Sequence, residues 1–196
     1  MISSILLAAG MSTRMGQPKA LLDWGGEPLV AYQVRQLREA GVDEVIVVLG
    51  HRADDIFRKM KGLPCRTMLN PLFFQGRAGS LRIGAKAVNR DADAIVVMNV
   101  DQPRTAEFLR DLIAAHKAGS AATRPAVDGK HGHPVVVAGA LRTEMMAATD
   151  EAEGLNGVLK AHAGELADFP SDDRSFLDMN TPAEYEAAKG RFGLVS

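Results

Sequence analysis

The chain has 196 residues, 46% of them hydrophobic, which suits one domain with a substantial core. Its 23 Lys and Arg residues and 24 Asp and Glu residues give a net charge of −1, which excludes a global positive field that would draw the chain to nucleic acid or to a membrane. The single cysteine, Cys65, excludes an internal disulfide, and the absence of a Cys and His ligand pattern argues against structural zinc. We therefore expect a cytoplasmic protein without nucleic-acid or membrane partners, in which any anion binding is local.

The N-terminal stretch Met1–Met11 is apolar, but no basic segment precedes it and it runs directly into a loop with Arg14 and Lys19. We interpret it as a buried strand and not as a signal peptide. No apolar run approaches the roughly 18 residues that a membrane-spanning helix needs.

Short aliphatic runs alternate with helical patterns through the first half of the chain. Continuous apolar runs predict strands covered on both faces at Ile2–Ala8, Glu44–Leu49 and Ala94–Val100. Apolar residues at helical spacing predict helices at Leu29–Ala40, Asp54–Met60, Leu81–Val88 and Thr105–Lys117, with Thr105 as an N-cap and with Gly41 and Gly119 ending the first and last helix. This alternation predicts an α/β fold, a three-layer α/β/α sandwich with a Rossmann-like, mainly parallel sheet.

The second half of the chain is less regular, and its elements are shorter. Strands are predicted at Ala121–Thr123, Pro134–Ala138 and Leu166–Phe169, and helices at Leu141–Ala148, Leu155–Ala163 and Thr181–Arg191. The last helix begins with Thr181 as N-cap, Pro182 at the first helical position and Glu184 two residues later, which is a capping box. The sequence contains no internal repeat, low-complexity tract or linker, so we expect residues 1–196 to form a single domain.

The loop after the first strand combines two glycines with two cations. In open parallel sheets, ligands bind beyond the carboxyl ends of the strands, so we expect the segments 8–19 and 101–103 to share one crevice. Gly10 and Gly16 are six apart and Lys19 is three further on, which excludes a P-loop and a dinucleotide fingerprint. Glycines let backbone N–H groups approach an anion, and Arg14 and Lys19 suit a triphosphate. The alternative is a solvated loop that happens to be basic.

This loop has the pattern Leu-x-x-Gly-x-Ser-x-Arg-x-Gly-x-x-Lys, and it resembles the signature loop of MobA-like nucleotidyltransferases at every fixed position. The resemblance implies a fold like that of the nucleotide-diphospho-sugar transferases. It also implies nucleotide binding by the residues of the loop, namely Leu7, Ala8, Ala9, Gly10, Ser12, Arg14, Gly16 and Lys19.

Asp101 follows an apolar run and falls in the predicted crevice. It either caps the next turn or helix, or serves as a ligand of Mg²⁺, a cation that prefers one or two carboxylates together with substrate phosphates. The family's Gly-Asp-x-Pro motif is similar to residues 100–103, although Val100 replaces the glycine. Family members carry Asp or Asn before a C-terminal Thr-Pro, which is similar to Asn180 here. Asp178 lies two residues earlier, on the same side if the chain is extended, and both residues are either metal contacts or caps of the last helix.

The segment Asn70–Gly84 resembles a family segment that lies against the nucleotide base. The residues implied there are Asn70, Gly79, Ser80 and Leu81, the last two of which open a helix whose N-terminus is expected to face the base or the phosphates. Phe73 and Phe74 are expected in the core and not as stacking platforms.

The acceptor side is indicated by Gly132, His133 and Pro134, which resemble the Gly-His-Pro of the cytidylyltransferase branch for molybdenum cofactor. The alternative is a loop histidine entering a strand. His131 and His133 have no third ligand nearby in sequence, so we predict no metal site on them. Relatives often have Gly-Ala-Arg where this chain has residues 154–156, Gly-Leu-Asn, which leaves Arg124 or Arg104 to replace the missing arginine.

The resemblance as a whole implies transfer of CMP from CTP to a phosphorylated acceptor, molybdopterin or molybdenum cofactor, with release of pyrophosphate. It implies Arg14, Lys19 and Asp101 as catalytic residues, Mg²⁺ as cofactor, nucleotide binding by residues 1–104, acceptor binding by residues 105–196, and a molybdoenzyme that receives the product. Three alternatives stay open: a sugar- or alditol-phosphate nucleotidyltransferase, a non-catalytic chaperone for a molybdoenzyme, and an NAD(P)H-dependent oxidoreductase, for which the dinucleotide fingerprint is missing.

Overall fold

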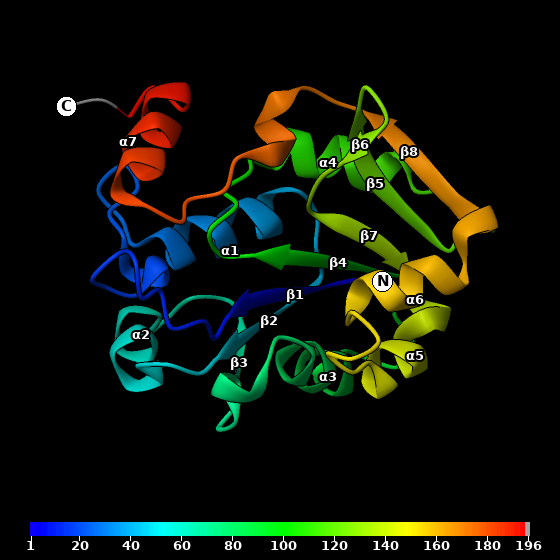
Figure 1. Ribbon diagram of the computed structural model, residues 1–196, viewed down its shortest axis with the longest axis horizontal. Coiled ribbons are helices and arrows are strands. Elements are labelled where there is room, and N and C mark those ends of the chain that lie inside the picture. The colour runs from blue at the N-terminus through cyan, green and yellow to red at the C-terminus, as the bar shows by residue number, and fades with distance from the viewer. Residues whose placement is uncertain (195–196) are drawn as a thin grey trace.

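An eight-stranded sheet runs through the computed structural model, which describes residues 1–194 (Figure 1). The strand order is β3-β2-β1-β4-β7-β5-β6, and β8 pairs with the other edge of β5. The strands are β1 Ile2–Ala8, β2 Glu44–Leu49, β3 Arg66–Leu69, β4 Ala94–Asn99, β5 Ala122–Val127, β6 Lys130–His131, β7 Val135–Ala138 and β8 Leu166–Pro170.

The sheet is mainly parallel, as predicted. Strand β1 lies parallel between β2 and β4, and the pairs β2–β3 and β5–β8 are also parallel. Strand β7 runs antiparallel to both β4 and β5, and β6 is a two-residue partner of β5. Edge strand β3 has no fully buried residue and β6 is exposed, so neither forms the continuous apolar run that marks a strand covered on both faces.

Helices cover both faces of the sheet and complete a three-layer sandwich (Figure 1). They are α1 Leu29–Glu39, α2 Ala53–Lys59, α3 Ala78–Ala87, α4 Ala106–Ala115, α5 Arg142–Ala147, α6 Leu155–Ala161 and α7 Pro182–Arg191. Successive residues of a strand face opposite layers, so Leu6 packs in the core under α1 and α4, while Ile5 packs in the core under α3, α5 and α6. Both side chains are fully buried.

Capping residues start two helices where the sequence predicts them. The side chain of Thr105 accepts a hydrogen bond from the N–H of Phe108, and Thr181 and Glu184 form the predicted capping box at α7. Helix α4 ends at Ala115, before Gly119, and α3 begins three residues earlier than its apolar spacing indicates. Within residues 1–194, no helix combines the length and the apolar character that crossing a bilayer requires.

Gly139, directly after β7, is expected to tolerate no side chain. A Cβ at this position would overlap the backbone carbonyl oxygen of Ala92, which cannot rotate away as a flexible side chain would. We expect Gly139→Ala to lower the free energy of unfolding by about 1–3 kcal/mol, as overpacking typically does. Urea denaturation measures the change. Gly164→Ala is the matched control, because a Cβ there meets no atom within 4 Å, and equal stability of the two variants would contradict the packing argument.

Candidate functional site

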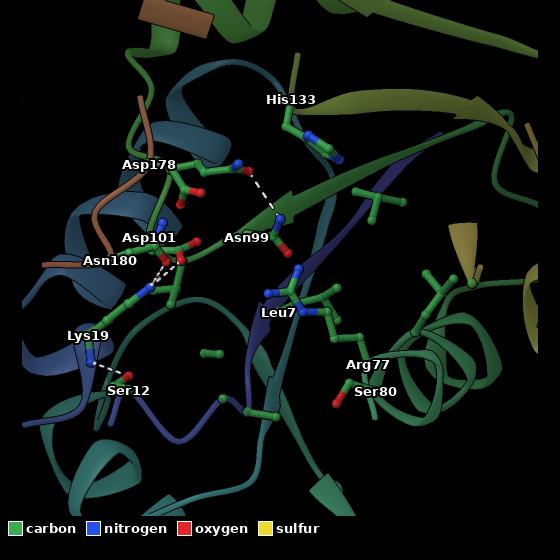
Figure 2. A pocket seen from close by; sticks show the side chains of 18 of the residues that line it. Leu7, Ser12, Lys19, Arg77, Ser80, Asn99, Asp101, His133, Asp178 and Asn180 are labelled. Carbon is green, nitrogen blue, oxygen red and sulfur yellow. Dashed lines mark hydrogen bonds and ion pairs between the residues drawn. The ribbon is translucent and has the colours of Figure 1, made fainter. Parts of the chain in front are cut away.

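A cleft of about 890 Å³ opens along the carboxyl ends of β1 and β4, where ligands bind in open α/β sheets (Figure 2). Its size lies within the range of small-molecule sites. The loop after β1, the turn after β4, the start of α3 and three C-terminal segments line it, at 131–133, 150–156 and 175–180. The two segments expected to share a crevice, 8–19 and 101–103, do contribute to the same cleft.

Most of the residues predicted for the site line this one cleft. These are Leu7, Ala8, Ala9, Gly10, Ser12, Arg14, Lys19, Ser80, Leu81, Asp101, Gly132, His133, Asp178 and Asn180. Four others do not line it, namely Gly16, Asn70, Gly79 and Pro134. Gly16 supplies a positive φ of 71° to the loop, and Asn70 is buried, where its amide donates to the Ser80 hydroxyl at 2.9 Å. Gly16 and Asn70 therefore shape the segments around the cleft without lining it.

Lys19 joins the first loop to the opposite wall of the cleft. Its ammonium donates to Asp101 Oδ2 at 2.6 Å and to Asn180 Oδ1 at 2.8 Å (Figure 2). Its backbone N–H donates to the Ser12 hydroxyl at 3.1 Å, which fixes the loop that precedes it. The side chains of Lys19 and Asp101 are only 13% and 20% exposed, so the pair is shielded from bulk water. Burial raises the pKa of the Asp101 carboxyl, and the hydrogen bond from Lys19 opposes this rise.

Asp178 adds a second carboxylate at the same end of the cleft (Figure 2). Its negative charge also raises the pKa of Asp101, so the two carboxylates are within electrostatic range of each other. The side chain that caps α7 is that of Thr181, which removes helix capping as the role of Asp178 and Asn180. Within the described chain, no three side chains of His, Cys, Asp or Glu gather closely enough to hold a metal ion. The oxygen donors at this end of the cleft are the carboxylates of Asp101 and Asp178 and the amide of Asn180.

Arg14 lies on the same loop as Lys19 and also lines the cleft. Its side chain is exposed and forms no hydrogen bond or ion pair with any residue of the described range 1–194. The first loop therefore presents one fixed cation, Lys19, and one cation that is free to bind a ligand.

Arg104 is buried against His133 and does not enter the cleft. It is 2% exposed, and its guanidinium donates to the carbonyl oxygens of Pro103, His133 and Ser175 at 2.7–3.0 Å. Burial lowers the pKa of Arg104 to about 10. The pKa of His133 is lowered by the burial of its own imidazole and, to a smaller extent, by the charge of Arg104. The expectation that Arg104 or Arg124 faces the acceptor is wrong, because Arg124 lies outside the cleft and pairs with Asp168 at 3.5 Å.

Gly132 and His133 are held against the segment that carries Asp178. A Cβ at Gly132 would lie 2.6 Å from the Ser175 carbonyl oxygen, and the His133 N–H donates to the same oxygen. The peptide bond from His133 to Pro134 is cis, and β7 begins directly after it. Glycine is required at position 132 because the two backbones approach too closely for a side chain.

One prediction for the segment 70–84 is wrong, and another is limited by a contact from a distant segment. The first turn of α3 lines the cleft, but two of its N–H groups are already paired, because the Asp150 carboxylate accepts from the N–H groups of Arg77 at 2.8 Å and Ala78 at 3.1 Å. Phe73 and Phe74 are not core residues: Phe74 is 62% exposed, Phe73 is half-buried, and both line the cleft. They sit on a short 3₁₀ turn, where apolar character alone did not distinguish a cleft wall from the core.

Arg77 is the main residue of the cleft that the sequence did not single out (Figure 2). Its charge also lowers the pKa of His133, so it lies within electrostatic range of that side chain. An arginine directly before a helix is an unremarkable signal in sequence. Phe176 was missed as well; it is 38% exposed and lines the cleft from the segment before Asp178.

The α/β sandwich, the cations of the first loop and the oxygen donors across the cleft are the arrangement expected of a nucleotidyltransferase. The chain belongs to the family described as the MobA-like NTP transferase domain, whose model matches residues 4–166.

Among curated proteins, the chain is 32% identical over 149 residues to nicotine blue oxidoreductase of Paenarthrobacter nicotinovorans, which covers 72% of each chain. It is 26% identical over 207 residues to the bifunctional protein GlmU of Sorangium cellulosum, covering 98% of this chain but only 40% of GlmU. Among solved structures, Rv0371c of Mycobacterium tuberculosis H37Rv superimposes with a TM-score of 0.83 at 26% identity over 100% of this chain and 98% of that one. A structure of Rv0371c in complex with manganese gives a TM-score of 0.76 at 26% identity, over 95% and 97% of the two chains.

Proposed function

We propose that the protein transfers CMP from CTP to a phosphorylated acceptor of the molybdopterin type and releases pyrophosphate. The observation that carries this proposal is the joint placement of Arg14, Lys19 and Asp101 in one cleft, with Lys19 bridging to Asp101 and Asn180. We assign nucleotide binding chiefly to residues 1–104 and acceptor binding chiefly to residues 105–196. The single cysteine supports a reducing compartment, the cytoplasm, as its location.

The reaction needs positioning and neutralisation of charge more than a protein nucleophile. Arg14 and Lys19 bind the triphosphate, with the backbone of residues 8–10 against it. An oxygen of the acceptor phosphate attacks the α-phosphorus in line, and the bond from that phosphorus to the bridging oxygen of the β-phosphate breaks. Pyrophosphate leaves with the electron pair and is stabilised by the same two cations. Gly132 and His133 contact the acceptor, and the lowered pKa of His133 keeps its imidazole neutral near pH 7.

The donor set at the end of β4 fits Mg²⁺. Asp101, Asp178 and Asn180 offer only hard oxygen atoms, and Mg²⁺ typically takes one or two carboxylates and completes its shell with water and substrate phosphates. A cation bound there would supply positive charge that stabilises the phosphates of the substrate. The manganese complex of Rv0371c supports a divalent cation in this fold. Asp101 and Asn180 would hold the cation, and Asp178 would add negative charge beside it.

The name of nicotine blue oxidoreductase favours a second candidate function, an oxidoreductase that binds NAD(P)H. The first loop lacks the Gly-x-Gly-x-x-Gly spacing with which dinucleotides are usually held, which favours the transferase. A nucleotidyltransferase for sugar or alditol phosphates differs only in the acceptor, and a maturation chaperone would bind the same ligands without turnover.

A thermal-shift panel of CTP, GTP, ATP, UTP and NADPH, each with Mg²⁺, tests the proposal. When all are added at the same concentration, we expect CTP to stabilise the protein most. The stabilisation is about 2.7 kcal/mol where that concentration is 100 times the Kd for CTP. A larger shift with GTP would overturn the assigned base, and a shift with NADPH alone would favour the oxidoreductase. Pyrophosphate release from CTP with molybdopterin separates an enzyme from a chaperone, and release with a sugar phosphate instead would replace the acceptor.

Gly10 offers a prediction that separates ligand binding from folding. A Cβ at this position meets no protein atom within 4 Å and Gly10 lines the cleft, so alanine is accommodated by the fold but fills space next to the ligand. We expect Gly10→Ala to weaken CTP binding by about tenfold, the equivalent of about 1.4 kcal/mol, with an unchanged melting temperature. Isothermal titration calorimetry measures the affinity, and undiminished binding would show that no ligand approaches this backbone.

A further inference from the structure

The guanidinium of Arg77 has no partner among the described residues of the protein. Its side chain is exposed, lines the cleft, and forms no hydrogen bond or ion pair with any residue in the described range 1–194. In Figure 2 it reaches from the start of α3 toward the ends of β1 and β4, while Lys19 approaches from the other side. The start of α3 therefore contributes a further cation to the cleft, in addition to those of the first loop.

The backbone under Arg77 is fixed by contacts from a distant segment. The Asp150 carboxylate accepts from the N–H groups of Arg77 and Ala78, and Gly154 lies next to Ala78, where an added Cβ would stand 3.9 Å from the alanine Cβ. The segment 150–156 thus packs on the start of α3 and lines the cleft beside Arg77. The backbone of Arg77 is therefore held in place where the segment 150–156 borders the cleft.

The neighbouring charges are occupied by other partners. Asp150 is engaged by backbone N–H groups, Glu153 pairs with Lys160, and His131 pairs with Asp168 at 3.1 Å. Lys19 is held by Asp101 and Asn180 on the other side of the cleft. The positive charge of Arg77 is consequently available to a ligand, and it lies within electrostatic range of His133 on the acceptor side.

We propose that Arg77 binds a phosphate monoester group of the acceptor and thereby selects anionic acceptors. The proposal rests on the proposed function, since it concerns the second substrate of that reaction. A guanidinium matches the geometry of a phosphate with two parallel hydrogen bonds, which an ammonium or an amide does not reproduce. It assigns to residue 77, in the first half of the chain, a part in acceptor recognition that the sequence placed wholly after residue 104.

The test compares Arg77→Gln and Arg77→Lys with Arg90→Gln, which makes the same change of charge at an exposed position outside the cleft. In steady-state transfer from CTP to molybdopterin, we expect Arg77→Gln to raise the KM for molybdopterin at least about tenfold, since hydrogen bonds to charged groups are strong. Arg77→Lys should be intermediate, and the Kd for CTP should not change. Arg90→Gln should match the wild type. A Kd for CTP that rises by the same factor as the KM would place Arg77 at the nucleotide and overturn the proposal.

A titration of phenyl phosphate decides the role of Arg77 without any turnover. Calorimetry is carried out on wild type and variants saturated with CTP and Mg²⁺, and again without nucleotide. We expect wild type and Arg90→Gln to bind the monoester and Arg77→Gln to bind it at least about tenfold more weakly in both series. Equal affinity in wild type and Arg77→Gln, or no binding to the wild type, would refute the proposal. Failure of wild type to modify molybdopterin, with the titration as expected, would refute the proposed acceptor and leave Arg77 as a phosphate-binding residue.

Discussion

Replacing Asp101 with alanine will lower nucleotidyl transfer by about 10²–10³-fold or more, while CTP still binds. The carboxylate is a proposed ligand of the cation and anchors Lys19, whereas Arg14, Lys19 and the backbone of the first loop remain to bind the triphosphate. Pyrophosphate release measures the rate, and calorimetry measures CTP binding.

Asp91→Ala is the control for this variant, because Asp91 is exposed and lies outside the cleft. Its activity should equal that of the wild type. A variant Asp101→Ala that retained full transfer would rule out Asp101 as a functional ligand. Loss of CTP binding to the same degree as loss of transfer would show instead that the carboxylate organises the whole cleft.

Replacing Lys19 with methionine is expected to have opposite effects on the two ligands of the site. Transfer should fall by about 10²–10³-fold, and CTP should bind more weakly, because a preorganised donor to the phosphates is lost. Binding of Mn²⁺ in the absence of nucleotide should tighten, because the ammonium contacts Asp101 and Asn180, the same oxygens proposed for the cation. Electron paramagnetic resonance of free Mn²⁺ measures this affinity without turnover.

Lys86→Met provides the comparison, since Lys86 is exposed on α3 and lies outside the cleft. It should leave both affinities unchanged. Weaker Mn²⁺ binding in Lys19→Met than in wild type would show that Lys19 supports the cation site and does not compete with it. Competition also implies that a nucleotide, by drawing the ammonium to its phosphates, makes cation binding more favourable, and the coupling must be reciprocal.

The sequence predicted the parts of the fold whose burial is uniform along the chain. Strands β1, β2 and β4 lie inside the sheet, so most of their residues are buried and apolar and each run stands out, even though β1 also buries Ser3 and Ser4. Edge strand β3 and two-residue β6 expose much of their length and carry no such pattern. Helix starts set by local caps, at Thr105 and Thr181, were predicted for the same reason: the partners lie within three residues.

The site was predictable where short motifs follow strand ends, and not where contacts join distant segments. Lys19 and Asn180 meet across 161 residues, and only resemblance to a family suggested that both belong to one site. Asp150 accepts from two N–H groups at the start of α3 from 72 residues away, a contact that the sequence of the helix did not reveal. The sequence around Arg104 did not indicate that this residue is buried. Its burial depends on two distant segments, at His133 and Ser175, whose carbonyl oxygens accept from its guanidinium.

The guanidinium of Arg104 joins three stretches of chain that are remote in sequence, at Pro103, His133 and Ser175, on the side of the cleft proposed for the acceptor. Its N–H groups are paired because the loop at His133 and the C-terminal segment at Ser175 both reach it, the latter 71 residues downstream. The end of β4 that carries Asp101 is held by pairing with β1 and β7, whereas the proposed acceptor side also depends on the segment around Ser175. Substitutions in the C-terminal segment near Ser175 are therefore expected to change the choice of the acceptor while leaving Lys19 and Asp101 in place.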